Sequence, residues 1–320
     1  MKHRTLSATL LASAAVSSCA VLSAGCGSDS PASDSSDLTG TQYVFLGEFV
    51  TADADYERWR EIQTGLEDQF DQICGDTFCE GDYSNIWSLG FECSVSSKQG
   101  RIRECVWTFA ASDEVIDGKT GAISSRVPFF ECRVRPTGTV KGLLPAFGDD
   151  PLNATLPGLE GSLYDALGDC FDAPVFVDQE PPAPKKGKFV NASDLLDGAD
   201  FDHWIEGSAA LRQEFDDVCG DTFCEGDYPN LQALRFRCSA HQTTGQIGQC
   251  AWVFAGSNEE RKSTGFITVD KAPFVCTFPV DATASELATL LDPAAGGEDP
   301  IRRVLPNSDK SIYDNLIDCL

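Results

Sequence analysis

Apolar residues recur at spacings of three and four positions in two separate stretches of the chain. The positions that share this spacing are Trp59, Ile62, Leu66, Phe70 and Ile73 in the first stretch, and Trp204, Leu211, Phe215 and Val218 in the second. Because an α-helix has about 3.6 residues per turn, this spacing places the apolar side chains on one face. Each stretch therefore predicts an amphipathic helix that packs on a core.

Downstream of each predicted helix, apolar and polar residues alternate, which predicts two strands paired as a hairpin. In the first hairpin we expect the facing pairs Cys93 with Cys105, Phe91 with Trp107, and Leu89 with Phe109. In the second we expect Cys238 with Cys250, Phe236 with Trp252, and Leu234 with Phe254. Cysteines at directly facing positions are close enough for a disulfide, so the register predicts one disulfide in each hairpin.

A third strand follows each hairpin and ends at PFFEC, residues 128–132, or at PFVC, residues 273–276. The extra residue in the first of these segments predicts a bulge or a shifted edge. A short helix then closes each half, at SLYDALGDC from Ser162 and at SIYDNLIDC from Ser311. A helix, an antiparallel sheet and a closing helix together predict an α+β fold.

The decapeptide CGDTFCEGDY begins at Cys74 and again at Cys219, a separation of 145 positions. Ten identical residues inside flanks that differ widely predict an internal duplication. We therefore expect two tandem domains of the same fold, residues 41–177 and residues 189–320. The segment between them, residues 178–188, is rich in Pro and Lys and predicts a semi-rigid linker.

The N-terminus combines the charged residues Lys2 and Arg4 with an apolar run from Leu6 to Leu22, as a secretory signal does. The run ends in LSAGC, residues 22–26, which resembles the lipobox of bacterial lipoprotein precursors. The resemblance implies that residues 1–25 are a signal peptide and that Cys26 becomes the N-terminus, modified by diacylglycerol and by a fatty acid such as palmitate. The alternative is an ordinary signal peptide that is cleaved nearby.

Residues 26–40 are rich in Ser and Asp and too polar to form a core, so they predict a lipidated cysteine followed by a flexible tether. Gly27 and Ser28 follow Cys26, and neither is the Asp that resembles an inner-membrane retention signal. We therefore expect a cell-envelope protein anchored by its lipid, with the outer membrane favoured.

Of the 14 cysteines, Cys19 leaves with the signal peptide and Cys26 carries the lipid. The other twelve divide evenly between the halves: Cys74, Cys79, Cys93, Cys105, Cys132 and Cys170, then Cys219, Cys224, Cys238, Cys250, Cys276 and Cys319. An even, repeated set behind an export signal predicts three disulfides per half in an oxidising compartment. Beyond the two hairpin disulfides the pairing stays open, since six cysteines allow 15 connectivities.

Acidic residues dominate the charge of the chain, with 50 Asp and Glu against 24 Lys and Arg and a formal net charge of -26. Such a surface repels phosphate backbones, so nucleic acid is excluded as a partner. The expected partners are the membrane, through the lipid anchor, and an unidentified protein or surface ligand.

The duplicated decapeptide gathers acidic residues in a loop between cysteines: Asp76, Glu80 and Asp82 in the first copy, and Asp221, Glu225 and Asp227 in the second. Calcium takes six to eight oxygen ligands, and these carboxylates with nearby carbonyl groups offer several, which makes Ca²⁺ a candidate ligand. The alternative is that the Asp and Gly residues only form turns between the cysteines.

Catalytic signals are sparse in the mature sequence. His203 and His241 align with Arg58 and Ser96 of the first half, so neither histidine is duplicated. No glycine-rich phosphate loop or cofactor motif accompanies the carboxylates, and all twelve cysteines are expected to be paired. We therefore expect a non-enzymatic binding or structural protein; an enzyme would require a cleft that holds a carboxylate of raised pKa.

Two alternatives remain. The first is an inhibitor of an extracellular hydrolase that presents the CGDTFC loop with Phe78 or Phe223 as its anchor. The second is a hydrolase that works with paired carboxylates.

Overall fold

Every strand described in the computed structural model pairs with its neighbours in the antiparallel sense. The described residues are 41–320 except 75–77, 81–82, 179 and 221, so the predicted signal peptide, Cys26 and the tether lie outside them. Residues Thr41–Leu320 form one compact unit. Antiparallel sheets combined with helices confirm the predicted α+β class.

The first half contributes a five-stranded sheet in the order β1-β2-β3-β6-β7 and a separate two-stranded sheet, β4-β5. Their bounds are β1 Tyr43–Phe45, β2 Trp87–Ser96, β3 Ile102–Ala110, β4 Asp113–Ile116, β5 Ile123–Arg126, β6 Pro128–Val134 and β7 Val175–Phe176. The second half contributes a four-stranded sheet in the order β11-β10-β9-β8. Its strands are β8 Phe189–Asn191, β9 Gln232–His241, β10 Ile247–Arg261 and β11 Ile267–Phe278.

Two 22-residue helices accompany these sheets, α2 (Asp53–Cys74) and α5 (Gly198–Cys219). The shorter helices are α1 Leu46–Phe49, α3 Val140–Ala146, α4 Leu163–Phe171, α6 Ala284–Leu291 and α7 Ile312–Ile317. Four 3₁₀ turns complete the described elements: η1 Phe78–Glu80, η2 Ala192–Leu195, η3 Pro293–Ala295 and η4 Pro300–Arg302. None of the described helices has the length and apolar character needed to cross a bilayer.

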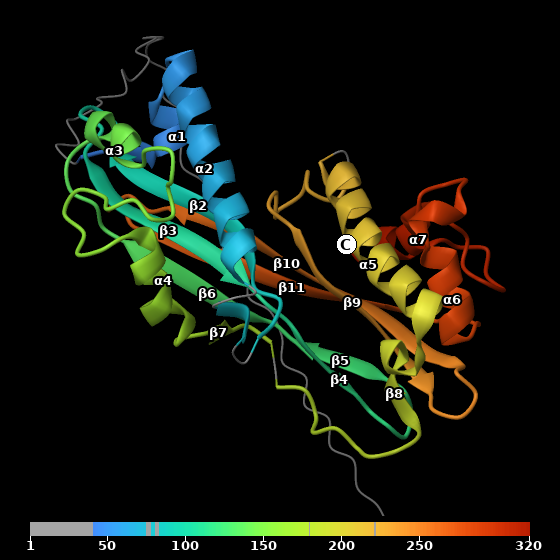
Figure 1. Ribbon diagram of the computed structural model, residues 1–320. Helices are drawn as coiled ribbons and strands as arrows, with labels where there is room; N and C mark the ends of the chain where they lie inside the picture. The colour runs from blue at the N-terminus through green and yellow to red at the C-terminus, as the bar shows by residue number, and fades with distance from the viewer. Residues whose placement is uncertain (1–40, 75–77, 81–82, 179, 221) are drawn as a thin grey trace, which may run out of the picture. The chain divides into compact units, whose positions relative to one another are not determined.

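The predicted apolar faces of the long helices form the centres of two cores. α2 lies along β2 and β3, and α5 lies along β9 (Figure 1). The buried residues that the two faces contribute are Trp59, Ile62, Leu66 and Phe70 from α2, and Trp204, Leu211 and Phe215 from α5. In the second core Gly207 lies against Leu291 of α6, where a Cβ atom would approach Leu291 to 2.6 Å. The glycine that interrupts the apolar stripe therefore allows close helix packing.

The six disulfides join the twelve predicted cysteines in pairs: Cys74–Cys79, Cys93–Cys105, Cys132–Cys170, Cys219–Cys224, Cys238–Cys250 and Cys276–Cys319. The two hairpin disulfides are confirmed. One further disulfide in each half reaches the last long strand, from Cys170 within α4 to β6 and from Cys319, just after α7, to β11.

The predicted hairpin register is confirmed at the cysteine and aromatic pairs, but it is wrong at the two leucines. Ser88, and not Leu89, faces Phe109, because the register shifts between Ser88 and Gly90. In the second hairpin, Phe254 faces Ala233 for the same reason. Such a bulge inserts one residue into the strand and changes which face the following side chains occupy. Leu89 and Leu234 therefore leave the helix-facing side of their sheets.

These displaced leucines form part of a third apolar cluster, which both halves share. Its buried members are Leu89, Ala110, Val127 and Phe129 from the first half, and Leu234, Val253 and Ala255 from the second. Each sheet thus buries one face against its helices and the other against the opposite half. This packing explains why consecutive residues of β3 and of β10, which point to opposite faces, are buried.

Contacts between the halves occur in matched pairs. Glu104 accepts a hydrogen bond from the amide of Ile267 (2.7 Å), and Gln249, 145 positions after Glu104, accepts one from the amide of Ile123 (2.7 Å). Likewise Gly265 packs on the ring of Tyr43, and Gly121 packs on the ring of Phe189. Each half therefore extends a hairpin over the first strand of the other half.

The extra residue before Cys132 has a different effect from the predicted bulge. In the second half, β10 and β11 pair without interruption, from Cys250 opposite Phe278 to Arg261 opposite Ile267. In the first half, the corresponding hairpin divides into β3-β6 and the separate pair β4-β5. The pairing of β3 with β6 itself is regular.

Candidate functional site

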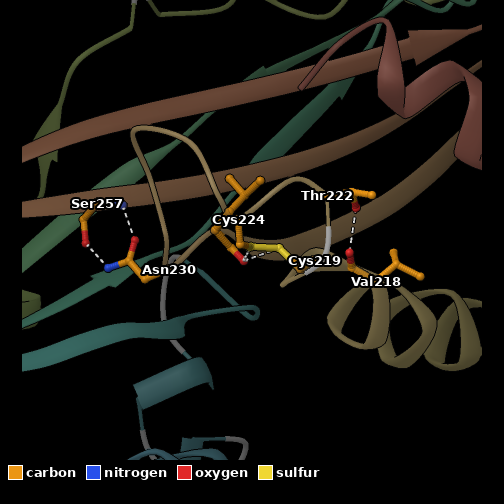
Figure 2. Close-up of a disulfide and its surroundings, with 7 residues drawn as sticks. Val218, Cys219, Thr222, Cys224, Asn230 and Ser257 are labelled. Atoms are coloured by element: carbon orange, nitrogen blue, oxygen red, sulfur yellow. Dashed lines mark hydrogen bonds between the residues drawn. A yellow bond between two sulfur atoms is a disulfide. The ribbon is translucent and has the colours of Figure 1, made fainter.

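Each copy of the duplicated decapeptide begins at the last residue of a long helix, and a disulfide joins its two cysteines, Cys74 to Cys79 and Cys219 to Cys224. In the second copy Cys224 N donates to the carbonyl of Cys219 (2.7 Å). Thr222 Oγ1 donates to the carbonyl of Val218 (2.6 Å; Figure 2). Both cysteine sulfurs lie 3.9 Å from the carbonyl oxygen of Leu231. These contacts come from Thr222 and the two cysteines, so the Asp and Gly turns that the sequence offers as the alternative to calcium binding stay a prediction.

Only some of the predicted calcium ligands lie among the described residues. Asp76, Asp82 and Asp221 lie outside the described residues, as does the side chain of Glu80. Glu225 and Asp227 are exposed. Within the described part of the chain, no group of three or more His, Cys, Asp or Glu side chains is placed to hold a metal ion. The calcium hypothesis stays a prediction.

The aromatic residues of the loop point into the protein. Phe78 packs against Phe171 with ring centroids 5.0 Å apart, and Phe223 packs against Phe215 at 5.7 Å. Both rings contribute to the cores of their own halves. Neither ring therefore serves as the exposed anchor that an inhibitor loop needs.

Just after each decapeptide, an asparagine begins a buried polar network. Asn230 Nδ2 donates to Ser257 Oγ (2.7 Å), and Ser257 N donates to Asn230 Oδ1 (2.7 Å; Figure 2). Ser257 Oγ in turn donates to Glu259 Oε1 (2.8 Å). In this way the network fixes the carboxylate of Glu259 at the boundary between the halves, where Thr108 Oγ1 also donates to it (3.0 Å).

The same network occurs 145 positions earlier. Asn85 Nδ2 donates to Ser112 Oγ (2.7 Å), Ser112 N donates to Asn85 Oδ1 (3.1 Å), and Ser112 Oγ donates to Glu114 Oε1. Here the carboxylate meets two guanidinium groups from the second half. Arg235 lies 3.5 Å and Arg237 lies 3.9 Å from Glu114 Oε2.

The positions that correspond to these two arginines are Gly90 and Glu92, each 145 positions earlier. Glu259 therefore faces a glycine and a second carboxylate where Glu114 faces two arginines. Gln63 Nε2 donates to Glu92 Oε1 (3.1 Å) and to the carbonyl of Phe91 (2.9 Å). Among the ion pairs of the described residues, none involves Glu92 or Glu259.

Glu92 and Glu259 border an open depression, which we call the acidic cleft. It consists of two adjoining hollows of about 450 Å³ and about 330 Å³. The residues that line both hollows are Arg60, Gln63, Glu92, Pro229 and Glu259. The larger hollow also includes Tyr56 and Trp59, and the smaller one includes Gly90 and Asn230. The cleft is therefore built by both halves of the chain.

Both carboxyl groups of the cleft have raised pKa values. The pKa of Glu92 is raised to about 7, mainly by burial and also by the negative charge of Glu259. The hydrogen bond from Gln63 and the charge of Arg60 act in the opposite direction. Burial also raises the pKa of Glu259, although the hydrogen bonds from Ser257 and Thr108 lower it. Perturbed carboxyl groups in a cleft are typical of functional sites.

Glu114 has a raised pKa as well, again through burial, but its neighbours differ. Ser112, Arg235 and Arg237 all lower it. The first carboxylate is thus compensated by positive charge from within the protein, whereas the two carboxylates of the acidic cleft repel each other.

A larger hollow of about 660 Å³ lies at the start of α2, next to α3. Its charged lining residues are Asp55, Arg58 and Lys141. Arg58 is held by an ion pair with Glu61 (3.2 Å) and a hydrogen bond to the carbonyl of Gly148. The hollow therefore combines both signs of charge and lacks the concentration of one charge that marks the acidic cleft.

Neither Glu92 nor Glu259 was among the residues predicted to form a site. The sequence does carry a signal for them, because Gly90, Glu92 and Glu67 align with Arg235, Arg237 and Arg212 at the separation of 145. These changes of charge between aligned positions mark the place where the two halves differ in chemistry.

The chain matches no family model, and neither curated protein sequences nor solved structures give a match.

Proposed function

We propose that this protein is an exported lipoprotein of the bacterial cell envelope, held to the membrane by lipid on Cys26, which binds its ligand in the acidic cleft without catalysis. The LSAGC sequence and the charged, then apolar leader support the anchor. The six disulfides support an oxidising compartment outside the cytoplasm. The outer membrane is the favoured location.

We further propose that residues 41–177 and 189–320 are two copies of one six-cysteine domain, each with a long helix, an antiparallel sheet and a short closing helix. The separation of 145 supports this, since it relates the decapeptides, the hairpin disulfides and the Asn-Ser-Glu networks alike. The copies share a buried apolar cluster, which holds them together. The acidic cleft is lined by residues of both copies, so binding there requires both.

The observation that carries the binding function is the acidic cleft itself. Glu92 and Glu259 are partly buried, repel each other and have no counter-ion among the described ion pairs. Keeping two such groups together costs stability in the ligand-free protein. A cost of this kind is typical of binding and catalytic sites, where function opposes stability.

A carboxylate-based hydrolase is the second candidate, since a pKa of about 7 suits Glu92 as a general acid. Its partner is less suited to chemistry. Glu259 accepts hydrogen bonds from Ser257 and Thr108, and Asn230 Nδ2 lies 3.5 Å from its second oxygen. A nucleophile or general base needs a free oxygen that faces the substrate, so these contacts favour binding.

Lipid anchoring is tested by fractionating cells that express the full chain or the variant Cys26→Ala, with Cys19→Ala as the matched control. We expect the wild type and Cys19→Ala in the detergent phase and Cys26→Ala in the aqueous phase. A Cys26→Ala variant that still partitions with detergent would contradict the anchor.

Binding in the cleft is tested by photo-crosslinking in intact cells from position 229, which lines both hollows. A crosslinker at Ile317, an exposed residue of α7 outside the cleft, is the control. We expect an adduct from position 229 that is lost in both Glu92→Gln and Glu259→Gln. An adduct that neither substitution changes would remove the cleft as the binding site.

A further inference from the structure

The two Asn-Ser-Glu networks have the same hydrogen bonds but different residues in front of their carboxylates. In the first network, the carboxylate of Glu114 is approached by Arg235 and Arg237. Arg237 Nη1 also donates to the carbonyl of Glu114 (2.8 Å), and Arg235 Nη2 donates to Ser84 Oγ (2.8 Å). Two guanidinium groups thus occupy the space in front of this carboxylate and neutralise it.

In the second network, the space in front of the carboxylate is open. A Cβ atom at Gly90 would meet only one heavy atom within 4 Å, Asn230 Nδ2 at 3.4 Å. The hollow of about 330 Å³ begins at this position. Glu92, at the position of the second arginine, adds another carboxylate to the wall. The cleft therefore has open space where the corresponding site holds guanidinium groups, and a second carboxylate, Glu92, where that site has Arg237.

From this comparison we propose that the acidic cleft binds a guanidinium group, supplied by a ligand, in the place that corresponds to Arg235 and Arg237. The inference rests on the proposed binding function and specifies its ligand class. A planar guanidinium group presents five N–H donors in a fixed fork, which matches paired carboxylates better than an ammonium group does.

The wider hollow of the cleft suits the rest of such a ligand. Tyr56 and Trp59 line it; Tyr56 is 49% exposed, whereas Trp59 is buried. Guanidinium groups stack on aromatic faces, so Tyr56 offers a contact that calcium cannot use. Calcium also needs six to eight oxygen ligands, more than the four carboxylate oxygens of Glu92 and Glu259 together.

Arg60 lines both hollows of the cleft and partly offsets its negative charge. A positive side chain there opposes the binding of a cationic ligand. The variant Arg60→Gln is therefore expected to bind guanidinium more tightly than the wild type, and weaker binding by this variant would count against the proposal.

The proposal predicts how affinity depends on pH. The groups that face Glu92 are Gln63, Glu259, Glu48 and Arg60. Because a protonated Glu92 cannot pair with a cation, affinity should fall as the pH is lowered through about 7. Binding near pH 7 should also release protons, which calorimetry detects as a dependence of the heat on the buffer.

The test is isothermal titration of the full chain, purified with its disulfides intact, at pH 8. The probes are agmatine as a free guanidinium compound, acetyl-Gly-Arg-Gly-amide as a peptide side chain, the corresponding Lys peptide, and calcium chloride. We expect both guanidinium probes to bind, and Glu92→Gln and Glu259→Gln each to weaken binding by about tenfold or more. Tighter binding of agmatine would assign a free compound, and tighter binding of the peptide a protein side chain.

Two variants keep the test independent of misfolding. Gly90→Arg places a guanidinium group in the cleft from within the chain, so it should abolish binding while the protein unfolds at the same or a higher temperature. Glu114→Gln makes the same chemical change as Glu259→Gln at the compensated site, and binding should be unchanged.

Absence of guanidinium binding would overturn the inference. So would equal binding of the Lys peptide, or binding that Gly90→Arg leaves intact. If the crosslinked adduct at position 229 still depends on Glu92 and Glu259 in that case, the cleft is a binding site for another class of ligand, and only the ligand class is wrong.

Discussion

The first and second halves of this protein use the same Asn-Ser-Glu network for opposite purposes. At Glu114 the network ends in ion pairs with Arg235 and Arg237, which close the boundary between the halves. At Glu259 it ends opposite Glu92 and Gly90, which leave the boundary open and negatively charged. The same fold thus accommodates both a carboxylate paired with arginines and a carboxylate beside an open cleft. The cleft depends on the side chains at positions 90 and 92 and not on the backbone.

The largest expected effect concerns the apolar cluster that both halves share, because this cluster holds the two halves together. Phe129 is fully buried in this cluster. Phe129→Ala should lower the free energy of unfolding by about 3–5 kcal/mol. Chemical denaturation, followed by tryptophan fluorescence, should show one transition for both halves; two separate transitions would mean that the halves unfold independently.

The next largest effect is expected at Glu92, in the acidic cleft. The pKa of Glu92 is raised in the folded protein, so the folded state binds more protons than the unfolded chain between pH 4.5 and about 7, and stability falls as the pH rises through this window. Glu92→Gln removes this loss and should raise the free energy of unfolding by roughly 2 kcal/mol at pH 8. Below pH 4.5 the variant and the wild type should be alike. Denaturant titrations at pH 4 and pH 8 measure both values.

A smaller change in the free energy of unfolding, of opposite sign, is expected at Glu114. Glu114→Gln removes the negative charge from Arg235 and Arg237, which are partly exposed and therefore recover some solvation. We expect a loss of about 1 kcal/mol at pH 8, since hydrogen bonds to charged groups contribute slightly more than neutral ones. A gain in stability equal to that of Glu92→Gln would show that the arginines do not compensate Glu114.

The smallest expected effect is that of calcium on the two decapeptide loops. If these loops are turns held by disulfides, millimolar calcium should leave the midpoint of thermal unfolding unchanged. Calcium bound only by the folded protein would raise its stability by about 2.7 kcal/mol at a hundredfold excess over the dissociation constant. A rise that disappears when Glu80 and Glu225 are both changed to Gln would establish the metal site instead.

Much of the fold was predictable because periodicity determines which residues face a core. The long helices, the facing cysteines and the Phe91–Trp107 pair follow from spacing alone. The positions of Leu89 and Leu234 could not be predicted, because a bulge has no signal in an alternating pattern. With those leucines misplaced, the second apolar face of each sheet and the contact between the halves were missed.

The candidate site was missed for a related reason. Identical residues drew attention to the decapeptide, whereas the acidic cleft is built where the copies differ, at Gly90 and Glu92. Nothing in the local sequence indicates that Glu92 lies near Glu259, since the two are far apart along the chain. Their proximity follows from how the halves pack, which is a property of the folded structure.

The packing of a hairpin from each half on the other half has a consequence for how the chain folds. The hairpin that contains Gly121 packs on Phe189, and Tyr43 of the first strand contacts Gly265 of the second half. A chain that is made from its N-terminus therefore exposes apolar surface until most of the second half has been made. Such high contact order slows folding and exposes intermediates to aggregation. Production of either half alone should for this reason require a chaperone, or the other half supplied in trans.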